Sequence, residues 1–302
     1  MCNVLFLFGA GASYGAGGIL PGRPPLGSNL FKDLSTVYPG TWGSLPSAIK
    51  ERFKNGNFEE GMGLIYKHLG TAIPELMRQM AIYFIQFRPI SDSSLYCSLI
   101  EDLADSIKLN EVLFSTLNYD CVLEFSLLSK GHRITYFDEG KDGEIPVWKL
   151  HGSCNFFSIG VQAGPGISYD TSIVWEGGIQ AFLDSNRVIE HCLVETGLAP
   201  IMSLYMEGKP LNVSPSAIIE LQSNWSDRVY NCSAVFLIGV RPWPNDEHIW
   251  KPLAETHSPI YFVGGFDEFD NWNSKFRQDF SEYLGGRFNT GYRKLIERIN
   301  AL

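Results

Sequence analysis

The sequence predicts an α/β protein with a parallel sheet that is covered by helices on both faces. Five short apolar runs indicate buried strands: VLFLF (4–8), EVLFSTL (111–117), VWKL (147–150), SAVFLIG (233–239) and PIYFVGG (259–265). Continuous apolar runs of this length are typical of parallel strands that are buried on both faces. Stretches with helical spacing separate the runs, and this alternation of strand and helix favours a parallel sheet.

Helices are expected after three of these runs, at residues 121–130, 245–255 and 269–284. Residues 26–110 carry apolar residues at helical spacing and few strand-like runs, so we predict a helical insertion between the first two strands. A further helix is expected around residues 178–193. No break in composition requires a second domain, and we therefore predict that the whole chain, 1–302, forms a single domain.

The composition indicates which partners and environments to expect for the protein. Of the 302 residues, 45% are hydrophobic, which is ample for a buried core. The formal net charge is −9 and no Lys/Arg cluster marks a basic face, so we expect no direct nucleic-acid binding. No apolar run reaches the ~18 residues of a membrane span, and we expect a cytoplasmic protein. The six cysteines are scattered without a CxxC pair, so we expect buried thiols and no zinc site.

The first apolar run ends in the turn GAGAS (9–13), where a strand passes into a helix. Backbone N–H groups at such a helix start can meet a pyrophosphate. Gly9 and Gly11 match the first two glycines of the dinucleotide fingerprint GxGxxG, but Tyr14 stands at the third and the next glycine comes one residue late. The acidic ribose ligand expected about 20 positions later has only Asp33 as a candidate, in a segment of helical character. These departures weaken a hydride-transfer interpretation, and a tight turn without a ligand stays open.

Polar residues or glycines follow three further runs, at strand ends that face the ligand crevice of an open α/β sheet. Asn118 and Asp120 follow the second run, His151 and Gly152 follow the third, and Gly239 ends the fourth. The ordinary pKa of histidine lies near neutrality, so His151 can serve as a general base. Each residue also has a structural alternative: Asn118 and Asp120 as helix caps, His151 as a core histidine, and Gly239 as part of a plain strand–helix connection.

Four motifs in this order resemble the SIR2 (sirtuin-like) family. They are GAGAS at 9–13, TLNYD at 116–120, KLHGS at 149–153 and FLIG at 236–239, whereas residues 26–110 lie outside the resemblance. The resemblance implies a Rossmann-like fold that binds NAD+. Leu117 replaces a glutamine of the family pattern, and the paired cysteines of the family's protein deacetylases are absent. The chain is therefore more similar to the SIR2-like domains of bacterial anti-phage systems, which hydrolyse NAD+ to nicotinamide and ADP-ribose.

The resemblance also implies roles for individual residues. Asn118 would orient the ribose or the attacking water, Asp120 would bind the nicotinamide carboxamide or orient the site, and His151 would accept a proton. The residues implied in NAD+ binding are Gly9, Ala10, Gly11, Ala12, Ser13, Thr116, Gly152 and Gly239. Arg23 and Arg241 are further candidates for phosphate contacts. NAD+ would be the substrate, with no other cofactor, no zinc and no other metal.

Related anti-phage proteins imply a homo-oligomer and a partner such as a HerA-type ATPase or an Argonaute-like sensor. In that setting the chain would be the NAD-depleting effector of an abortive infection response. Three other functions stay open: an NAD-dependent deacylase, an ADP-ribosyltransferase, and a non-catalytic module that binds NAD or ADP-ribose. A conventional dehydrogenase is disfavoured because no acidic ribose ligand is convincingly placed.

Overall fold

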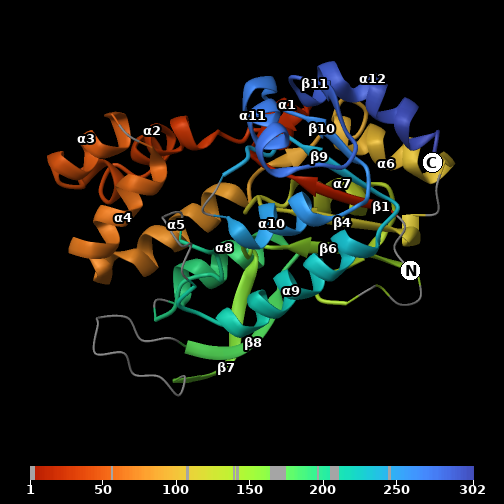
Figure 1. The fold of residues 1–302 in the computed structure, drawn as a ribbon. Helices are drawn as coiled ribbons and strands as arrows, with labels where there is room; N and C mark the ends of the chain where they lie inside the picture. The colour runs from red at the N-terminus through yellow and green to blue at the C-terminus, as the bar shows by residue number, and fades with distance from the viewer. Residues whose placement is uncertain are drawn as a thin grey trace.

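A computed structural model describes residues 4–55, 57–106, 109–138, 140, 143–163, 175–195, 197–204, 211–243 and 246–302. Seven strands form a parallel sheet in the order β11-β10-β9-β1-β4-β6-β5, with helices on both of its faces (Figure 1). The strands are β1 (Val4–Phe8), β4 (Val112–Thr116), β5 (Arg133–Thr135), β6 (Glu144–Lys149), β9 (Ala234–Ile238), β10 (Ile260–Val263) and β11 (Ser281–Gly285). The predicted α/β, Rossmann-like fold class is confirmed.

Strand β1 lies at the centre of the sheet, between β4 and β9, and all five of its residues are buried. Phe6 and Phe8 point into the core on one face, whereas Leu5 and Leu7 point into the core on the other. Both faces of the strand are therefore apolar. This double burial explains why the strand reads as a continuous apolar run rather than an alternating one.

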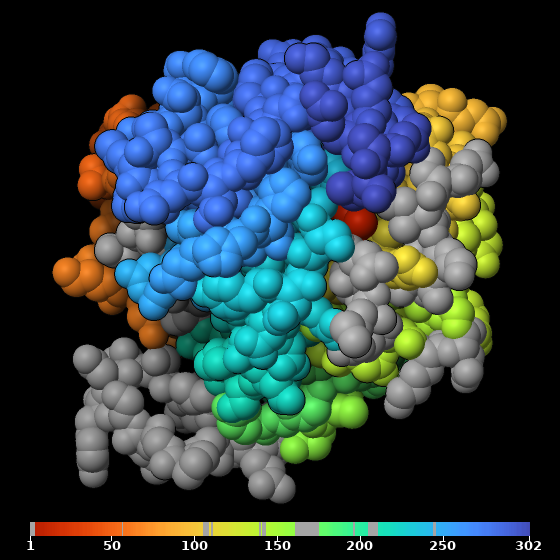
Figure 2. All heavy atoms as spheres, turned by 45° about the vertical axis from the view of Figure 1, so that its right-hand side comes forward, coloured from red at the N-terminus to blue at the C-terminus, as the bar shows by residue number. Residues whose placement is uncertain are grey.

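The helices pack on either face of the sheet or lie beside it. They are α1 (Ala10–Gly15), α2 (Gly27–Val37), α3 (Ser47–Asn55), α4 (Phe58–His68), α5 (Ile73–Phe84), α6 (Leu95–Ser106), α7 (Val122–Ser129), α8 (Ser185–Val194), α9 (Pro215–Asn231), α10 (Glu247–Glu255), α11 (Phe266–Phe276) and α12 (Phe288–Ile299). The apolar residues of α9, α10 and α11 pack on the Leu5 face. Those of α1, α6, α7 and α12 belong to the core of the opposite face. Figure 2 shows the C-terminal part of the chain, from cyan to dark blue, over the centre and top of the surface in view.

The segment 26–110 is mainly helical, as predicted, and supplies α2 to α6 between β1 and β4. In Figure 1, α2, α3 and α4 lie beside the sheet. An aromatic cluster holds them together: the Phe31 and Phe53 rings stack at 4.3 Å, and the fully buried Trp42 packs against Phe53 and Phe58. A short strand, β3 (Arg88–Pro89), returns the chain to the start of the insertion by pairing with β2 (Ile19–Leu20).

The helix predicted at 269–284 is wrong in its second half. Helix α11 ends at Phe276, and residues 281–285 form the edge strand β11. The cause is Arg277, which is buried and donates hydrogen bonds to the carbonyl oxygens of Leu253, Thr256 and Ser258 at 2.6–2.9 Å. These bonds tie the chain to the end of α10 and turn it out of the helical path.

The helix predicted at 178–193 is also wrong in its first half. Residues Trp175–Ala181 form β8, which pairs antiparallel with β7 (Phe156–Ala163) in a separate two-stranded sheet. Helix α8 begins only at Ser185, where the Asp184 carboxylate accepts a hydrogen bond from the Asn186 amide at 2.8 Å. This N-cap places the helix start after the strand.

We expect truncation of Phe6 to destabilise the whole fold. Its buried ring stacks on those of Phe236, Phe114 and Phe8, with centroids 5.0–5.9 Å apart. Phe6→Ala should lower the free energy of unfolding by about 3–5 kcal/mol, because the cavity lies at the centre of the sheet. Urea unfolding measures this, with Phe276→Ala at a 60% exposed side chain as the control. An equal loss in both variants would contradict the central role of β1.

Candidate functional site

The strand order creates a topological switch point between β1 and β9. From β1 the chain continues to β4 and β6 on one side of the sheet, and later to β9, β10 and β11 on the other. In open α/β sheets, ligands bind at the carboxyl ends of the strands at such a point. Gly9 follows β1 and Gly239 follows β9, so both glycine turns lie there.

The two glycine turns pack backbone against backbone. The Gly9 amide donates to the Ile238 carbonyl at 2.9 Å, and the Gly11 amide donates to the Gly239 carbonyl at 3.0 Å. A Cβ on Gly9 would lie 2.5 Å from the Gly239 carbonyl oxygen, and one on Gly11 would lie 2.9 Å from the same atom. Gly239 has φ of 64°, and a Cβ there would collide with the backbone of Ala12. The glycines at 9, 11 and 239 are therefore required by this close approach.

This packing limits which atoms of the turn can face a phosphate. The Gly11 amide is used by Gly239, and the Ala12 amide donates to the Gly9 carbonyl at 2.9 Å. Ser13 is 1% exposed, and its hydroxyl points inward. Ala10, by contrast, is exposed at the start of α1. Of the predicted phosphate-binding amides from Ala10 to Ser13, those of Gly11 and Ala12 are therefore bonded to other backbone groups of the two turns.

The structure brings Ser13, Asn118 and Asp120 together in one hydrogen-bond network. The Asn118 amide Nδ2 donates to the Gly9 carbonyl at 3.0 Å and to the Ser13 Oγ at 3.1 Å. Ser13 Oγ in turn donates to Asp120 Oδ1 at 3.3 Å. The hydroxyl of Tyr96 lies 3.2 Å from Ser13 Oγ and closes the network from α6. The ends of β1 and β4 are therefore joined through side chains that the sequence places more than a hundred positions apart.

Thr116 shapes the turn that carries Asn118. Its hydroxyl donates to the Phe8 carbonyl at 3.1 Å and accepts a hydrogen bond from the Asn118 amide at 3.0 Å. Leu117 adds a backbone bond to the same Phe8 carbonyl. These bonds aim the Asn118 side chain back toward the β1 turn. The alternative role of Asn118 as a cap of α7 is not what the geometry shows, although Asp120 does bond the Val122 amide at the start of that helix at 3.1 Å.

A buried lysine lies directly behind Asp120. Lys149, the last residue of β6, is fully buried, donates to the backbone carbonyl of Asp120 at 2.5 Å and pairs with Glu124 at 3.0 Å. Burial acts to lower the pKa of Lys149, but the acidic groups around it, with Glu124 the strongest, together outweigh burial, and the pKa lies above its usual range. Burial raises the pKa of Asp120, and the charge of Lys149 only partly opposes this. One buried ammonium thus serves two buried carboxyl groups.

His151 follows β6 and is 4% exposed. Its Nε2 lies 3.2 Å from Nε2 of His248, a half-buried residue in the first turn of α10. Gly152 has φ of 74°, and its neighbour Ser153 bonds the Ile201 carbonyl at 2.9 Å. The His151 carbonyl accepts the Ser203 amide at 2.8 Å, so the turn is fixed on two sides.

His151 and Asn118 occupy equivalent positions on neighbouring strands. Thr116 of β4 pairs with Lys149 of β6, and each of the two residues lies two positions beyond this pair. Neighbouring strands are about 4.8 Å apart, so both residues belong to the same edge of the sheet. The structure therefore gathers Gly9, Asn118, His151 and Gly239 at one edge. Tyr96, Lys149 and His248 complete this site, and sequence reasoning missed all three.

The two candidate phosphate arginines lie on the surface of this region. The Arg23 guanidinium lies 5.5 Å from the centroid of the Tyr14 ring. The Arg241 side chain is 70% exposed and lies 3.7 Å from the Glu268 carboxylate. Their roles stay predictions.

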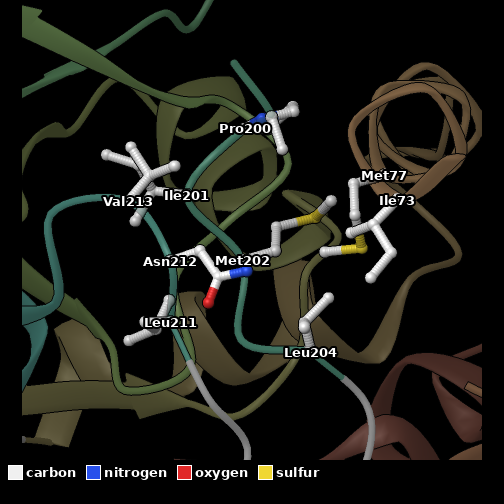
Figure 3. Close-up of a pocket in the computed structure, with 10 residues that line it drawn as sticks. Ile73, Met77, Pro200, Ile201, Met202, Leu204, Leu211, Asn212 and Val213 are labelled. Carbon is white, nitrogen blue, oxygen red and sulfur yellow. The ribbon is translucent and has the colours of Figure 1, made fainter. Parts of the chain in front are cut away.

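A small apolar pocket flanks the segment that fixes Gly152 (Figure 3). Ile73 and Met77 of α5 line one side, and residues 199–202, 204 and 211–213 line the rest. Its volume of about 30 Å³ suits a single water molecule rather than a dinucleotide. The pocket is therefore too small to hold a dinucleotide.

Three further features of the described part of the chain concern metals, membranes and thiols. No group of three or more His, Cys, Asp or Glu side chains lies close enough to hold a metal ion there. None of the helices in those ranges has the length and apolar character to cross a membrane. Cys97, Cys121, Cys154, Cys192 and Cys232 are buried free thiols, and Cys2 lies outside the described residues.

Comparison with known proteins does not place the chain in a family. No protein-family model matches it, and a comparison with curated protein sequences finds no match. The likeness to SIR2-like domains therefore rests on the four motifs and on nothing broader.

We expect Asp120→Asn to increase stability at neutral pH. The folded-state pKa of Asp120 is raised by burial, so the wild-type protein loses stability as pH rises from the unfolded pKa through the folded one. Asparagine has the shape of aspartate without its charge. The gain in free energy of unfolding should therefore be largest above the pKa that Asp120 has in the folded protein, and should vanish below its pKa in the unfolded chain. Urea unfolding of both proteins across an acid-to-neutral pH series measures this. The charge argument would be contradicted if the difference in free energy of unfolding, Asp120→Asn minus wild type, were smaller at pH 7 than at acidic pH.

Proposed function

We propose that the chain is an NAD+ glycohydrolase that cleaves NAD+ to nicotinamide and ADP-ribose. One observation carries the proposal: Ser13, Asn118 and Asp120 are hydrogen-bonded at the switch point, with His151 at the neighbouring strand end. The reaction adds one water across the bond between nicotinamide and ribose and releases one proton. A site for it needs a group that orients the ribose or the water, a base for the proton and negative charge near the cationic ribose.

Asn118 suits the orienting role. The structure gives two hydrogen bonds from its Nδ2, to Gly9 and Ser13, and these account for both amide hydrogens. The carbonyl Oδ1 is then the atom that accepts a hydrogen bond from a ribose hydroxyl or from the attacking water. Because the amide is held at two points, the acceptor is oriented before the substrate binds.

His151 suits the role of the base, and Asp120 suits the role of the negative charge near the ribose. His151 is almost fully buried at the strand end next to Asn118, where a neutral imidazole can accept the proton of the water or of a ribose hydroxyl. Asp120 lies behind Ser13 and is 5% exposed. Its carboxylate, when ionised, favours the positive charge that develops on the ribose as nicotinamide departs. We propose this electrostatic role in place of a direct contact with the carboxamide.

The proposal extends to the biological setting implied by the motifs. We infer a cytoplasmic, NAD-depleting effector of a bacterial anti-phage system that acts as a homo-oligomer with a sensing partner. Constant NAD+ hydrolysis would harm the host, so such an enzyme requires restraint by assembly or by the partner. The gene neighbourhood tests this part, because an adjacent HerA-type ATPase or Argonaute-like gene is expected.

We expect His151→Ala and Asn118→Ala each to lower NAD+ hydrolysis by about 10²- to 10⁴-fold, since each removes a group of the reacting site. Chromatography of nicotinamide and ADP-ribose measures the rate, and thermal unfolding verifies that each variant folds. His257→Ala and Asn231→Ala are matched controls, because both side chains lie on the surface away from the switch point. An active wild type with equally active Ala variants at 118 and 151 would refute the site.

Nicotinamide release and NAD+ binding together distinguish the other functions. Release of nicotinamide only when an acylated peptide or a protein acceptor is supplied would indicate a deacylase or an ADP-ribosyltransferase. NAD+ binding by calorimetry without any turnover would indicate a binding module.

A further inference from the structure

The contact between His151 and His248 joins two parts of the chain that are 97 positions apart. His151 follows β6, whereas His248 lies in α10, the helix after β9. The two Nε2 atoms are 3.2 Å apart, and the ring planes meet at 61° with centroids 5.3 Å apart. This is the geometry of a hydrogen bond from one ring edge to the other.

A hydrogen bond between two Nε2 atoms needs one proton on one of the two nitrogens. The ring that donates carries its proton on Nε2, and the ring that accepts is neutral with its proton on Nδ1. Two protonated Nε2 atoms at this distance would repel each other. The contact therefore couples the tautomers of the two rings, because one must donate and the other accept, keeps at least one ring neutral, and limits the rotation of the His151 ring.

The packing around His248 fixes its position beside His151. The next residues, Ile249 and Trp250, are buried, and the Trp250 ring packs at 5.1 Å on Trp272 of α11. The helix follows the Gly239 turn, which is itself locked onto Gly9 and Gly11. The packing that assembles the switch point thus also positions His248.

We propose that His248 is a positioning residue for His151: its Nε2 accepts the Nε2–H of the buried His151 ring and holds the ring in one orientation, which leaves Nδ1 of His151 as the atom that accepts a proton. This inference rests on the proposed NAD+ hydrolysis. Positioning acts on the chemical step and leaves substrate contacts in place, so its loss should lower kcat with little change in KM. Removing a residue that orients another functional side chain typically costs 10- to 100-fold in activity, and we expect about that loss for His248→Ala.

The test compares His248→Ala with His248→Gln. The terminal amide of glutamine lies near the position of the histidine Nε2 and can donate or accept a hydrogen bond, so His248→Gln should stay within about threefold of wild-type kcat. His257→Ala is the matched control, because that histidine is 93% exposed and contacts Asp279 instead. Nitrogen-15 NMR of the His151 ring gives a readout that does not depend on activity. We expect His248→Ala to shift its signals toward a mixture of tautomers and His248→Gln to restore them.

Each outcome decides the proposal. A loss of kcat in His248→Ala that glutamine restores, together with the shifted His151 signals, supports it. Unchanged kcat in His248→Ala overturns it. Equal losses in both variants with unshifted His151 signals also overturn it, because His248 would then take part in proton transfer itself. A wild-type protein that does not hydrolyse NAD+ even with its partner and trigger present refutes the proposed function, and the NMR comparison still decides whether His248 positions His151.

Discussion

The structure of the site depends on the close approach of two backbone turns, at Gly9–Gly11 after β1 and at Gly239 after β9. The hydrogen bond between the Gly11 amide and the Gly239 carbonyl, at 3.0 Å, holds the two turns together at the switch point. With the turns locked, α1 starts at Ala10 and Ser13 is directed to Asn118 and Asp120. The same lock places α10, and with it His248, beside the end of β6. A side chain at any of these glycines would separate the parts of the site.

A second constraint is electrostatic and comes from the buried Lys149. Lys149 connects the end of β6 to Glu124 of α7 and to the backbone of Asp120. A buried ion pair gives little net stability, because desolvation of the charges offsets their attraction. It does fix the relative positions of β6, which carries His151, and of the turn after β4, which carries Asn118 and Asp120. Burial of the Asp120 carboxyl group in the same place raises its pKa, and the charge of Lys149 only partly opposes this.

Local patterns in the sequence predicted the features that depend on local physics. The double burial of β1 produces its apolar run, and Asn118 and His151 were predicted because each directly follows such a run. Tyr96 and His248 could not be predicted in the same way, since they reach the site through crossovers of the chain. Lys149 offered a weak signal, as a charged residue that ends an apolar strand. Arg277 offered none, because its carbonyl partners lie in the last turn of α10 and just beyond it, about 20 positions earlier in the chain. The local pattern therefore predicts helix where the edge strand β11 forms.

The departures from the dinucleotide fingerprint have a structural basis that bears on the proposed function. Gly15, rather than residue 14, packs against α12, where a Cβ would lie 3.5 Å from the Cβ of Phe288. Asp33, the candidate ribose acid, lies in α2 of the insertion and accepts a hydrogen bond from Tyr83 at 3.1 Å. It does not follow a strand of the central sheet, as the ribose ligand of a hydride-transferring enzyme does. The polar side chains at the strand ends are instead an amide, a carboxyl group and an imidazole, which are groups that orient water and move protons. This chemistry favours the hydrolysis of a nucleotide over its use as a hydride carrier.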